Sequence, residues 1–165
     1  MNNNRKIYIY TDGSSRGNPG PGGYGVFIEE MIIGLSYAKK VISEGYRYTT
    51  NNRMELLAII VGLENIKKKK QNIIVFTDSK YIVNTIQNKW IDDWKKNNFY
   101  KKKNADLWKR FLPLFYKHYV IFQWIKGHSN HYINDYCDRL STAAAKKNKN
   151  LKIDYVYEKN NNIII

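Results

Sequence analysis

The sequence predicts one α/β domain built around a mixed sheet of five strands. Its 165 residues are the length of one ordinary domain, and we find no internal repeat and no linker long enough to divide the chain. Three strand-like segments come first, and helices then alternate with two further strands. Strands followed by a helix–strand–helix pattern are typical of an α/β domain with a mixed sheet.

The N-terminal segments predict an antiparallel meander. KIYIYT at 6–11 is β-branched and aromatic, and this strand ends at Asp12. The following loop of Gly, Pro, Ser and Asn lacks the glycine spacing of a dinucleotide site and the Gly-Lys-Ser/Thr ending of a P-loop. The next strands are predicted at 24–30 and 32–41, with a hairpin turn near 31–34.

Residues 52–70 are predicted to form a helix. Apolar residues recur at the spacing of one helical face, at Met54, Leu57, Ala58 and Val61. Lysines at 67–70 are expected at its C-terminal end, where positive charge complements the helix dipole.

Beyond residue 70, strands and helices alternate. The apolar run 72–78 is typical of a strand covered on both faces, and Ser79 is a suitable N-cap for a helix at 80–88. An aromatic, lysine-rich segment at 89–104 breaks the pattern. A helix, a strand and a helix are then predicted at 105–117, 120–126 and about 133–146.

Residues 147–165 are basic, rich in Asn and without clear periodicity, so we expect a loosely held tail after a domain at 1–146. The single cysteine, Cys137, cannot form an internal disulfide and is expected to be buried. No apolar stretch approaches the roughly 20 residues that span a bilayer, and the N-terminus carries no apolar signal region. We therefore expect a cytoplasmic monomer without membrane contact or an obligatory protein partner.

The charge of the chain indicates a polyanionic partner. The formal net charge is +14, from 28 Lys and Arg against 14 Asp and Glu. A surface of that sign attracts nucleic acid. The alternative is that richness in Lys, Asn and Ile reflects AT-biased codons, so the charge alone does not decide.

Four carboxylates occupy comparable places in the predicted elements. Asp12 and Asp78 end strands, Glu55 lies in the first turn of a helix, and Asp138 lies near the start of the last helix. Carboxyl ends of neighbouring parallel strands meet at one edge of a sheet. Crowded carboxylates are stabilised by divalent cations such as Mg²⁺, and two ions about 4 Å apart support phosphodiester hydrolysis. The alternative is that each acid is separately a helix cap or a surface charge.

Four motifs in this order closely resemble the type 1 ribonuclease H family, in its bacterial form with a basic protrusion, over about residues 6 to 146. They are YTDGSSRGNPGPGGYG at 10–25, TTNNRMEL at 49–56, FTDSKYI at 76–82 and KGHSNHYINDYCDRL at 126–140. The resemblance implies a ribonuclease H-like fold with helices on both faces of the sheet. It also implies sequence-independent, endonucleolytic hydrolysis of the RNA strand of RNA–DNA hybrids, leaving 3′-hydroxyl and 5′-phosphate ends.

The resemblance assigns roles to five residues. Asp12, Glu55, Asp78 and Asp138 match the metal-binding acids, with two Mg²⁺ ions expected and Mn²⁺ as the alternative. His128 matches a mobile histidine that helps proton transfer or product release. The other histidines, His118 and His131, are expected to have structural, capping or surface roles.

Polar residues near the first helix match the substrate contacts of the family. Asn18, Asn51 and Asn52 match its minor-groove contacts, where amides can recognise 2′-hydroxyls. Thr50 and Asn104 match its pocket for a DNA phosphate. The alternatives are turn formation for Asn18 and helix capping for Asn51 and Asn52.

The segment 90–104 resembles the basic protrusion of the family. Trp90 and Trp94 are four residues apart on one helical face, with Lys95 and Lys96 beside them. Aromatic faces can pack on deoxyribose while lysines meet phosphates. The alternative is that both tryptophans are core residues and the lysines form a solvated face.

The chain departs from the family pattern at three places. The connection from Lys95 to Asn104 is shorter than in well-known bacterial relatives, and Lys80 stands where glutamine is common. Tyr48 replaces a frequent arginine, and Arg47, one residue earlier, points to the opposite face of a strand. The sequence therefore does not decide whether an arginine contributes to the charge of the phosphate pocket.

Two other functions remain possible from the residues. One is a hybrid-binding module without catalysis, although all four acids and the histidine are present. The other is a related metal-dependent nuclease, such as a Holliday-junction resolvase or an integrase, which would lack the asparagine pair before Glu55.

Overall fold

The protein is described by a computed structural model that covers residues 4–127 and 130–164. The strands are β1 (Arg5–Ser15), β2 (Gly20–Ile32), β3 (Leu35–Thr49), β4 (Asn72–Thr77) and β5 (Tyr119–Trp124). The helices are α1 (Asn51–Glu64), α2 (Lys80–Gln87), α3 (Trp90–Lys96), α4 (Ala105–Lys117), α5 (Tyr132–Ala145) and α6 (Tyr155–Asn160). Within the described part of the chain, no helix is long and apolar enough to cross a membrane.

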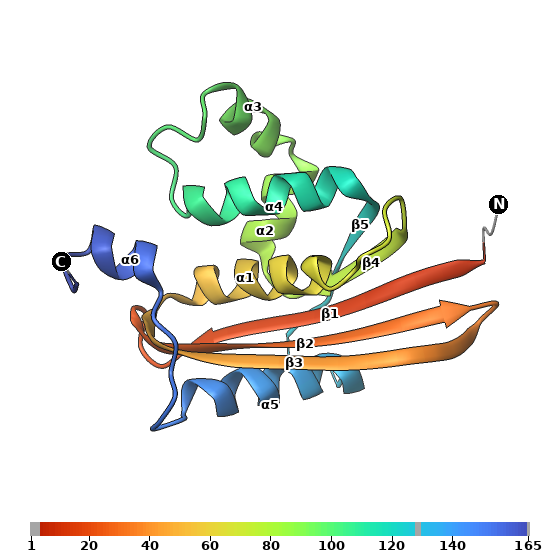
Figure 1. Cartoon of the computed structure of the whole chain (residues 1–165), viewed down its shortest axis with the longest axis horizontal. Helices are drawn as coiled ribbons and strands as arrows, with labels where there is room; N and C mark the ends of the chain where they lie inside the picture. The colour runs from red at the N-terminus through yellow and green to blue at the C-terminus, as the bar shows by residue number, and fades with distance from the viewer. Residues whose placement is uncertain (1–3, 128–129, 165) are drawn as a thin grey trace.

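The five strands form one mixed sheet in the order β3-β2-β1-β4-β5, which confirms the predicted fold class (Figure 1). The first three strands pair antiparallel, and β4 lies parallel to both β1 and β5. In the β1–β4 register, Tyr10 faces Phe76. Asp12 and Asp78 each follow two residues later, so both lie at the same edge of the sheet.

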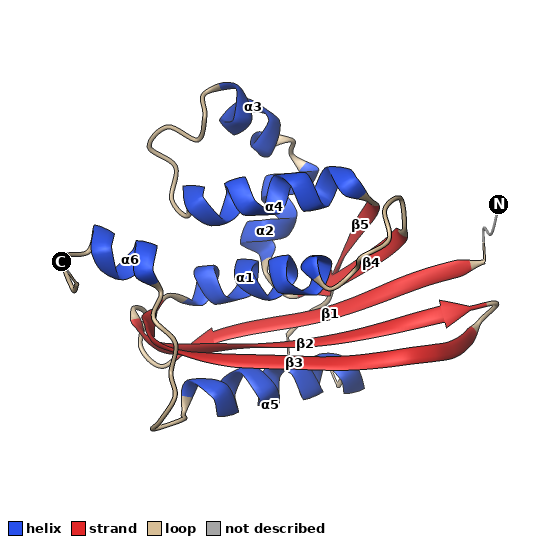
Figure 2. Ribbon diagram, in the orientation of Figure 1, coloured by secondary structure: helices blue, strands red, loops and turns tan. Residues whose placement is uncertain are grey.

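Helices cover both faces of this sheet (Figure 2). Helix α5 packs on one side of β1, β2 and β3, and α1 packs on the other side, with α4 beyond it. The apolar core fills the layer around α1, where Ile9 of β1, Ile60 of α1 and Trp108 of α4 are fully buried. Because α1 lies between the sheet and α4, apolar or small residues occur nearly all around it.

Helix α1 is shorter than predicted. It ends at Glu64, and Lys67, Lys68, Lys69 and Lys70 lie outside it as exposed loop residues. The predicted contribution of these lysines to the last helical turn is therefore wrong. The helix ends here because the side-chain amide of Asn65 donates to the Val61 carbonyl and the side chain of Ile66 is buried in the core.

The C-terminal segment differs from the expected loosely held tail. Lys152 forms a bridge with Tyr46 beside β3, and helix α6 follows. Two acids of this segment, Asp154 and Glu158, are buried against arginines of the domain. Ion pairs with partners far away in sequence thus order a segment that lacks hydrophobic periodicity. The division of the chain at residue 146 stays a prediction.

Candidate active site

Three of the predicted acids meet at one edge of the sheet. Asp12 lies inside β1, which continues to Ser15 and does not end at Asp12 as predicted. Glu55 lies in the second turn of α1 and not in the first, and Asp78 lies directly after β4. One oxygen from each lies within 4.8 Å of the others. Asp12 is 5% and Glu55 is 4% exposed, and Asp78 is half-buried. The cluster therefore opens to solvent on the Asp78 side.

Glycines beside two of these acids allow the close packing. A Cβ atom on Gly13 would lie 2.3 Å from the backbone nitrogen of Glu55, so α1 can cross β1 here only over a glycine. A Cβ atom on Gly127 would lie 2.7 Å from Oδ2 of Asp78. The glycine after Asp12 therefore brings Glu55 to the cluster.

The electrostatics of the cluster favour a bound cation. Burial, followed by the charge of Asp78, raises the pKa of Asp12 from 3.8 to about 8. Burial and then the charges of Asp12 and Asp78 raise the pKa of Glu55 well above its usual range. Oε2 of Glu55 is buried and, among the described residues, has no hydrogen-bond partner. Carboxylate oxygens that lack protein donors suit a hard divalent cation.

The fourth acid, Asp138, lies in the middle of α5 rather than near its start as predicted. Its side chain approaches Asp12, whose pKa it raises further through a hydrogen bond and its charge. Helix α5 is held against β1 at this level, since Sγ of Cys137 donates to the Tyr10 carbonyl at 3.4 Å. Asp138 is not among the three acids whose oxygens all lie within 4.8 Å of one another.

The histidines have separate positions. His128 lies outside the described residues, so its predicted role stays a prediction. His131 is the N-cap of α5, and its Nδ1 accepts a hydrogen bond from the Asn134 nitrogen at 3.3 Å. The buried His118 accepts from the Gln71 nitrogen at 3.3 Å. Both structural predictions are confirmed.

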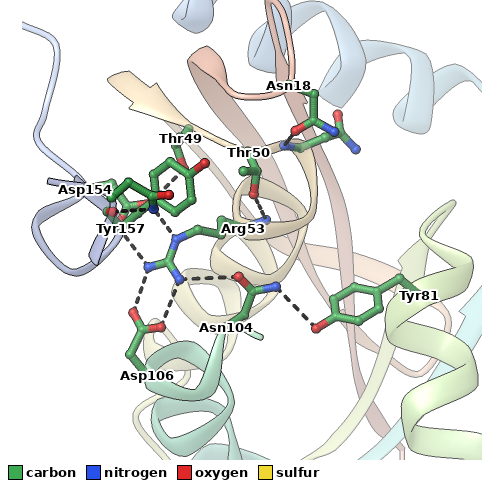
Figure 3. Close-up of polar contacts among 11 residues, drawn as sticks. Asn18, Thr49, Thr50, Arg53, Tyr81, Asn104, Asp106, Asp154 and Tyr157 are labelled. Carbon is green, nitrogen blue, oxygen red and sulfur yellow. Dashed lines mark hydrogen bonds and ion pairs between the residues drawn. The ribbon is translucent and has the colours of Figure 1, made fainter. Parts of the chain in front are cut away.

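Four predicted substrate-contact residues line one hollow of about 610 Å³, namely Asn18, Thr50, Asn52 and Asn104. Oδ1 of Asn18 accepts from the Asn51 nitrogen at 3.1 Å, which joins the Gly/Pro loop to the start of α1 (Figure 3). Thr50 is the N-cap of α1 and accepts from the Arg53 nitrogen at 3.3 Å. The cap is therefore Thr50, and the alternative of Asn51 or Asn52 as the cap is wrong.

Arg53 connects the walls of this hollow (Figure 3). Its buried guanidinium donates to both oxygens of Asp106, at 2.9 and 2.7 Å, and to both oxygens of Asp154, at 2.7 and 2.8 Å. It also donates to Oδ1 of Asn104 at 3.4 Å, and Nδ2 of Asn104 donates to the Tyr81 hydroxyl at 3.3 Å. This network fixes the orientation of the Asn104 amide.

Comparison with known proteins identifies the family. The RNase H family model matches residues 4–146. The chain belongs to the RNase H family. Ribonucleases H from Desulforamulus reducens and Wigglesworthia glossinidia brevipalpis are each 48% identical to it, over 92% and 94% of this chain and 94% and 96% of theirs. The chain is therefore classed as an enzyme, a nuclease of the ribonuclease H type.

Solved structures of RNase H proteins have the same fold. LC9-RNase H1, a type 1 RNase H with the type 2 active-site motif, is 30% identical with a TM-score of 0.76, covering 86% of this chain and 72% of that one. LC11-RNase H1, solved in complex with an RNA/DNA hybrid, is 28% identical with a TM-score of 0.59, covering 84% of this chain and 96% of that one.

The two tryptophans of the RNase H protrusion have different environments. Trp90, the first residue of α3, is 45% exposed. Trp94 packs against the core, with its ring centroid 5.9 Å from that of Trp108 in an edge-to-face arrangement. The Lys102 ammonium lies 5.2 Å from the centroid of the Trp94 ring. Trp90 thus has the larger exposure for a sugar contact, and Trp94, which is partly buried, also has a packing role.

The lysines next to these tryptophans are exposed. Nζ of Lys95 lies 4.9 Å from the ring centroid of Tyr116, and Lys96 pairs with Asp93 at 3.6 Å. Exposed contacts of this kind are weak, so both ammonium groups remain accessible to phosphates.

The departures from the family pattern have structural consequences. Arg47 donates to both oxygens of Glu158, at distances from 2.7 to 3.2 Å, and does not line the hollow. The ring centroid of Tyr48 lies 5.8 Å from the ring centroid of Tyr157. Nζ of Lys80 lies 5.2 Å from the centroid of the Trp124 ring. The inference that Arg47 points away from the phosphate pocket agrees with this geometry.

Sequence reasoning missed the residues that build the hollow from the C-terminal segment. The missed signals are an arginine in a largely apolar helix, Arg53, and two acids four residues apart in a basic tail, Asp154 and Glu158. A buried charge requires a partner, so each signal predicts a long-range ion pair without naming the partner.

Proposed function

We propose that the chain is an endonuclease that hydrolyses the RNA strand of RNA–DNA hybrids, without sequence preference, leaving 3′-hydroxyl and 5′-phosphate ends. The observation that carries this proposal is the carboxylate cluster of Asp12, Glu55 and Asp78, with oxygens within 4.8 Å of one another, in a chain of the RNase H family. The hybrid bound to the relative LC11-RNase H1 supports this substrate.

The acids of the cluster would hold divalent ions. Asp12, Glu55 and Asp78 supply the oxygens, with Asp138 as a fourth ligand beside Asp12. We propose two Mg²⁺ ions, with Mn²⁺ as the alternative. When bound, such a pair supplies an activated water and stabilises the departing oxygen of a phosphodiester. The buried oxygen of Glu55 without a protein donor fits this use.

The remaining site residues would bind and orient the hybrid. Asn18, Asn51 and Asn52 present amides at one end of α1, where they can recognise 2′-hydroxyls in a wide minor groove. Thr50 and Asn104 line the hollow that would hold a phosphate of the DNA strand. A short fixed donor set of this kind positions the backbone without reading the bases.

The protrusion would contact the DNA strand at a second place. The exposed ring of Trp90 and the partly buried ring of Trp94 can pack on deoxyribose, and Lys95 and Lys96 can meet phosphates. His128 would move a proton or assist product release. We further propose that the protein acts in the cytoplasm as a monomer.

Cleavage of three labelled substrates tests the proposal. An RNA–DNA hybrid, duplex DNA and duplex RNA are incubated with the chain, with and without Mg²⁺. We expect cleavage of the RNA strand of the hybrid alone, and only with Mg²⁺. Hybrid binding without cleavage would favour an inactive binding module, and cleavage of duplex DNA would favour a resolvase-type nuclease.

A matched pair of variants tests the site. Asp12→Asn removes one charge from the cluster, and Glu30→Gln removes one from an ion pair with Arg5 at the far end of β2. We expect a loss of at least roughly 100-fold in kcat for Asp12→Asn and an unchanged rate for Glu30→Gln. Equal rates in the two variants would overturn the assignment.

A further inference from the structure

Helix α6 forms one wall of the 610 Å³ hollow. Tyr157, Asn160 and Asn161 line it together with the start of α1 and the segment 102–106. Ligand pockets are commonly about 300 to 1,000 Å³. The hollow is thus large enough for more than a single phosphate group. Helix α6 lies outside residues 4–146, which the family model matches.

Buried ion pairs fix α6 in this position. The side chain of Glu158 is fully buried and accepts from Nε and Nη2 of Arg47, at 2.9 and 2.7 Å. One turn earlier, Asp154 accepts from Arg53 and from Oγ1 of Thr49 at 2.7 Å. Both acids are held by groups on β3 and α1, the two elements that Thr50 joins, so α6 is fixed next to Thr50.

The lining of the hollow suits a polyanion. Lys102 and Lys103 supply the positive charge of its lining, because the guanidinium of Arg53 is already paired with Asp106 and Asp154. Both oxygens of Asp106 already accept from Arg53. The lysines are exposed, and five asparagines add amide groups to the lining. Amides and lysines are typical donors to a nucleic-acid backbone.

We propose that α6 extends the phosphate site, with Asn160 contacting the nucleic-acid backbone next to the phosphate held by Thr50 and Asn104. The amide of Asn161 donates to the Tyr157 carbonyl at 2.8 Å, so Asn160 is the residue assigned to this contact. The proposal rests on the proposed function for the identity of the ligand, an RNA–DNA hybrid. It gives the C-terminal segment a role in substrate affinity and not only in stability.

Charge substitutions of opposite sign at Asn160 test this role in the full chain. The Kd for a fluorescent RNA–DNA hybrid is measured by anisotropy in EDTA, where no cleavage occurs. We expect Asn160→Glu to raise Kd by roughly 3- to 10-fold. Asn160→Lys is expected to lower Kd and to steepen the slope of log Kd against log salt by about one.

The matched controls are Asn148→Glu and Asn148→Lys. Asn148 is exposed in the same C-terminal segment, and it does not line the hollow. Both controls are expected to keep the wild-type Kd and Tm. Equal effects at the two positions would indicate only a general charge effect and would overturn the proposal.

The outcomes separate this proposal from the proposed function. If both Asn160 variants raise Kd alike and lower Tm, α6 has a structural role only and the inference is wrong. If wild type binds the hybrid but does not cleave it with Mg²⁺, the enzyme assignment fails while the Kd comparison still decides on α6. Absence of hybrid binding by wild type would overturn both.

Discussion

Arg53 of α1 and Asp154 of the C-terminal segment form a buried ion pair across 101 residues of chain. The guanidinium donates from Nε at 2.7 Å and from Nη2 at 2.8 Å. The side chains are only 4% and 9% exposed. Because the same guanidinium also binds Asp106 of α4, one cation connects three parts of the fold.

Removal of one partner of this pair is expected to be costly. Asp154→Ala leaves part of the Arg53 guanidinium buried without an acceptor, and we expect the free energy of unfolding to fall by about 3 kcal/mol. Denaturation with urea measures the change. Glu64→Ala is the control, since it breaks a two-hydrogen-bond pair with Arg110 whose side chains are 36% and 47% exposed. The control should lose less than about 1 kcal/mol. Equal losses would contradict the account of the C-terminal segment.

Two glycine substitutions should separate stability from metal binding. Gly13→Ala places a Cβ atom against backbone atoms of Met54 and Glu55, so we expect a loss of roughly 2 kcal/mol or more in stability. Gly127→Ala meets the movable side chain of Asp78 instead. We expect a small change in Tm and weaker Mg²⁺ binding, measured by calorimetry. Unchanged Mg²⁺ affinity in Gly127→Ala would contradict the prediction that this contact positions Asp78 for metal binding.

The two tryptophans of the protrusion are expected to have different roles, Trp94 mainly in packing and Trp90 in substrate contact. Trp94→Ala removes a ring packed on Trp108, and we expect a loss of roughly 2 kcal/mol in unfolding free energy. Trp90→Ala should keep the wild-type Tm because its ring is exposed, and should raise KM for the hybrid without lowering kcat. Thermal unfolding and steady-state cleavage measure the two effects. An unchanged KM in Trp90→Ala would exclude the proposed sugar contact.

The stability of the metal-free protein should depend on the charge of Asp12. Its pKa in the folded protein is about 8 against an ordinary value of 3.8, because of burial and the charge of Asp78. Between these pH values the folded chain retains a proton that the unfolded chain has lost. The contribution of Asp12 to stability is therefore highest below about pH 4 and decreases as the pH rises to about 8, by at most roughly 6 kcal/mol.

Asp12→Asn tests this dependence because it cannot ionise. In EDTA, we expect the variant and wild type to have similar Tm values near pH 4, and the variant to be the more stable at pH 8. Addition of Mg²⁺ at pH 8 should raise the Tm of wild type and not that of the variant. If wild type is as stable as the variant at pH 8 in EDTA, the negative charge of Asp12 does not destabilise the folded protein, and the prediction is wrong.

The sequence was sufficient to predict the sheet and the positions of the central acids. Asp12 and Asp78 follow the apolar residues of β1 and β4, and these residues are paired in parallel, so the two acids meet at one edge of the sheet even though β1 continues to Ser15. The position of Glu55 follows from the start of a helix that was predicted from apolar residues at helical spacing, although α1 is buried nearly all around. These features depend on local patterns whose consequences are fixed by the geometry of a sheet and a helix.

The C-terminal wall of the hollow could not be predicted in the same way. Asp154 and Glu158 pair with Arg53 and Arg47, which are 101 and 111 residues away. An ion pair between distant residues leaves no periodicity in the sequence. The end of α1 was also missed, because the side-chain cap by Asn65 depends on a local hydrogen bond that competes with helix continuation.

The measurement that tests the central claim most directly is the rate of hybrid cleavage by wild type and Glu55→Gln across a Mg²⁺ titration. Glu55 is chosen because its buried Oε2 has no donor within the described residues. We predict no cleavage without Mg²⁺, saturable cleavage by wild type, and a loss of at least roughly 100-fold in the variant. Cleavage that is independent of Mg²⁺, or a variant with the wild-type rate, would contradict the account.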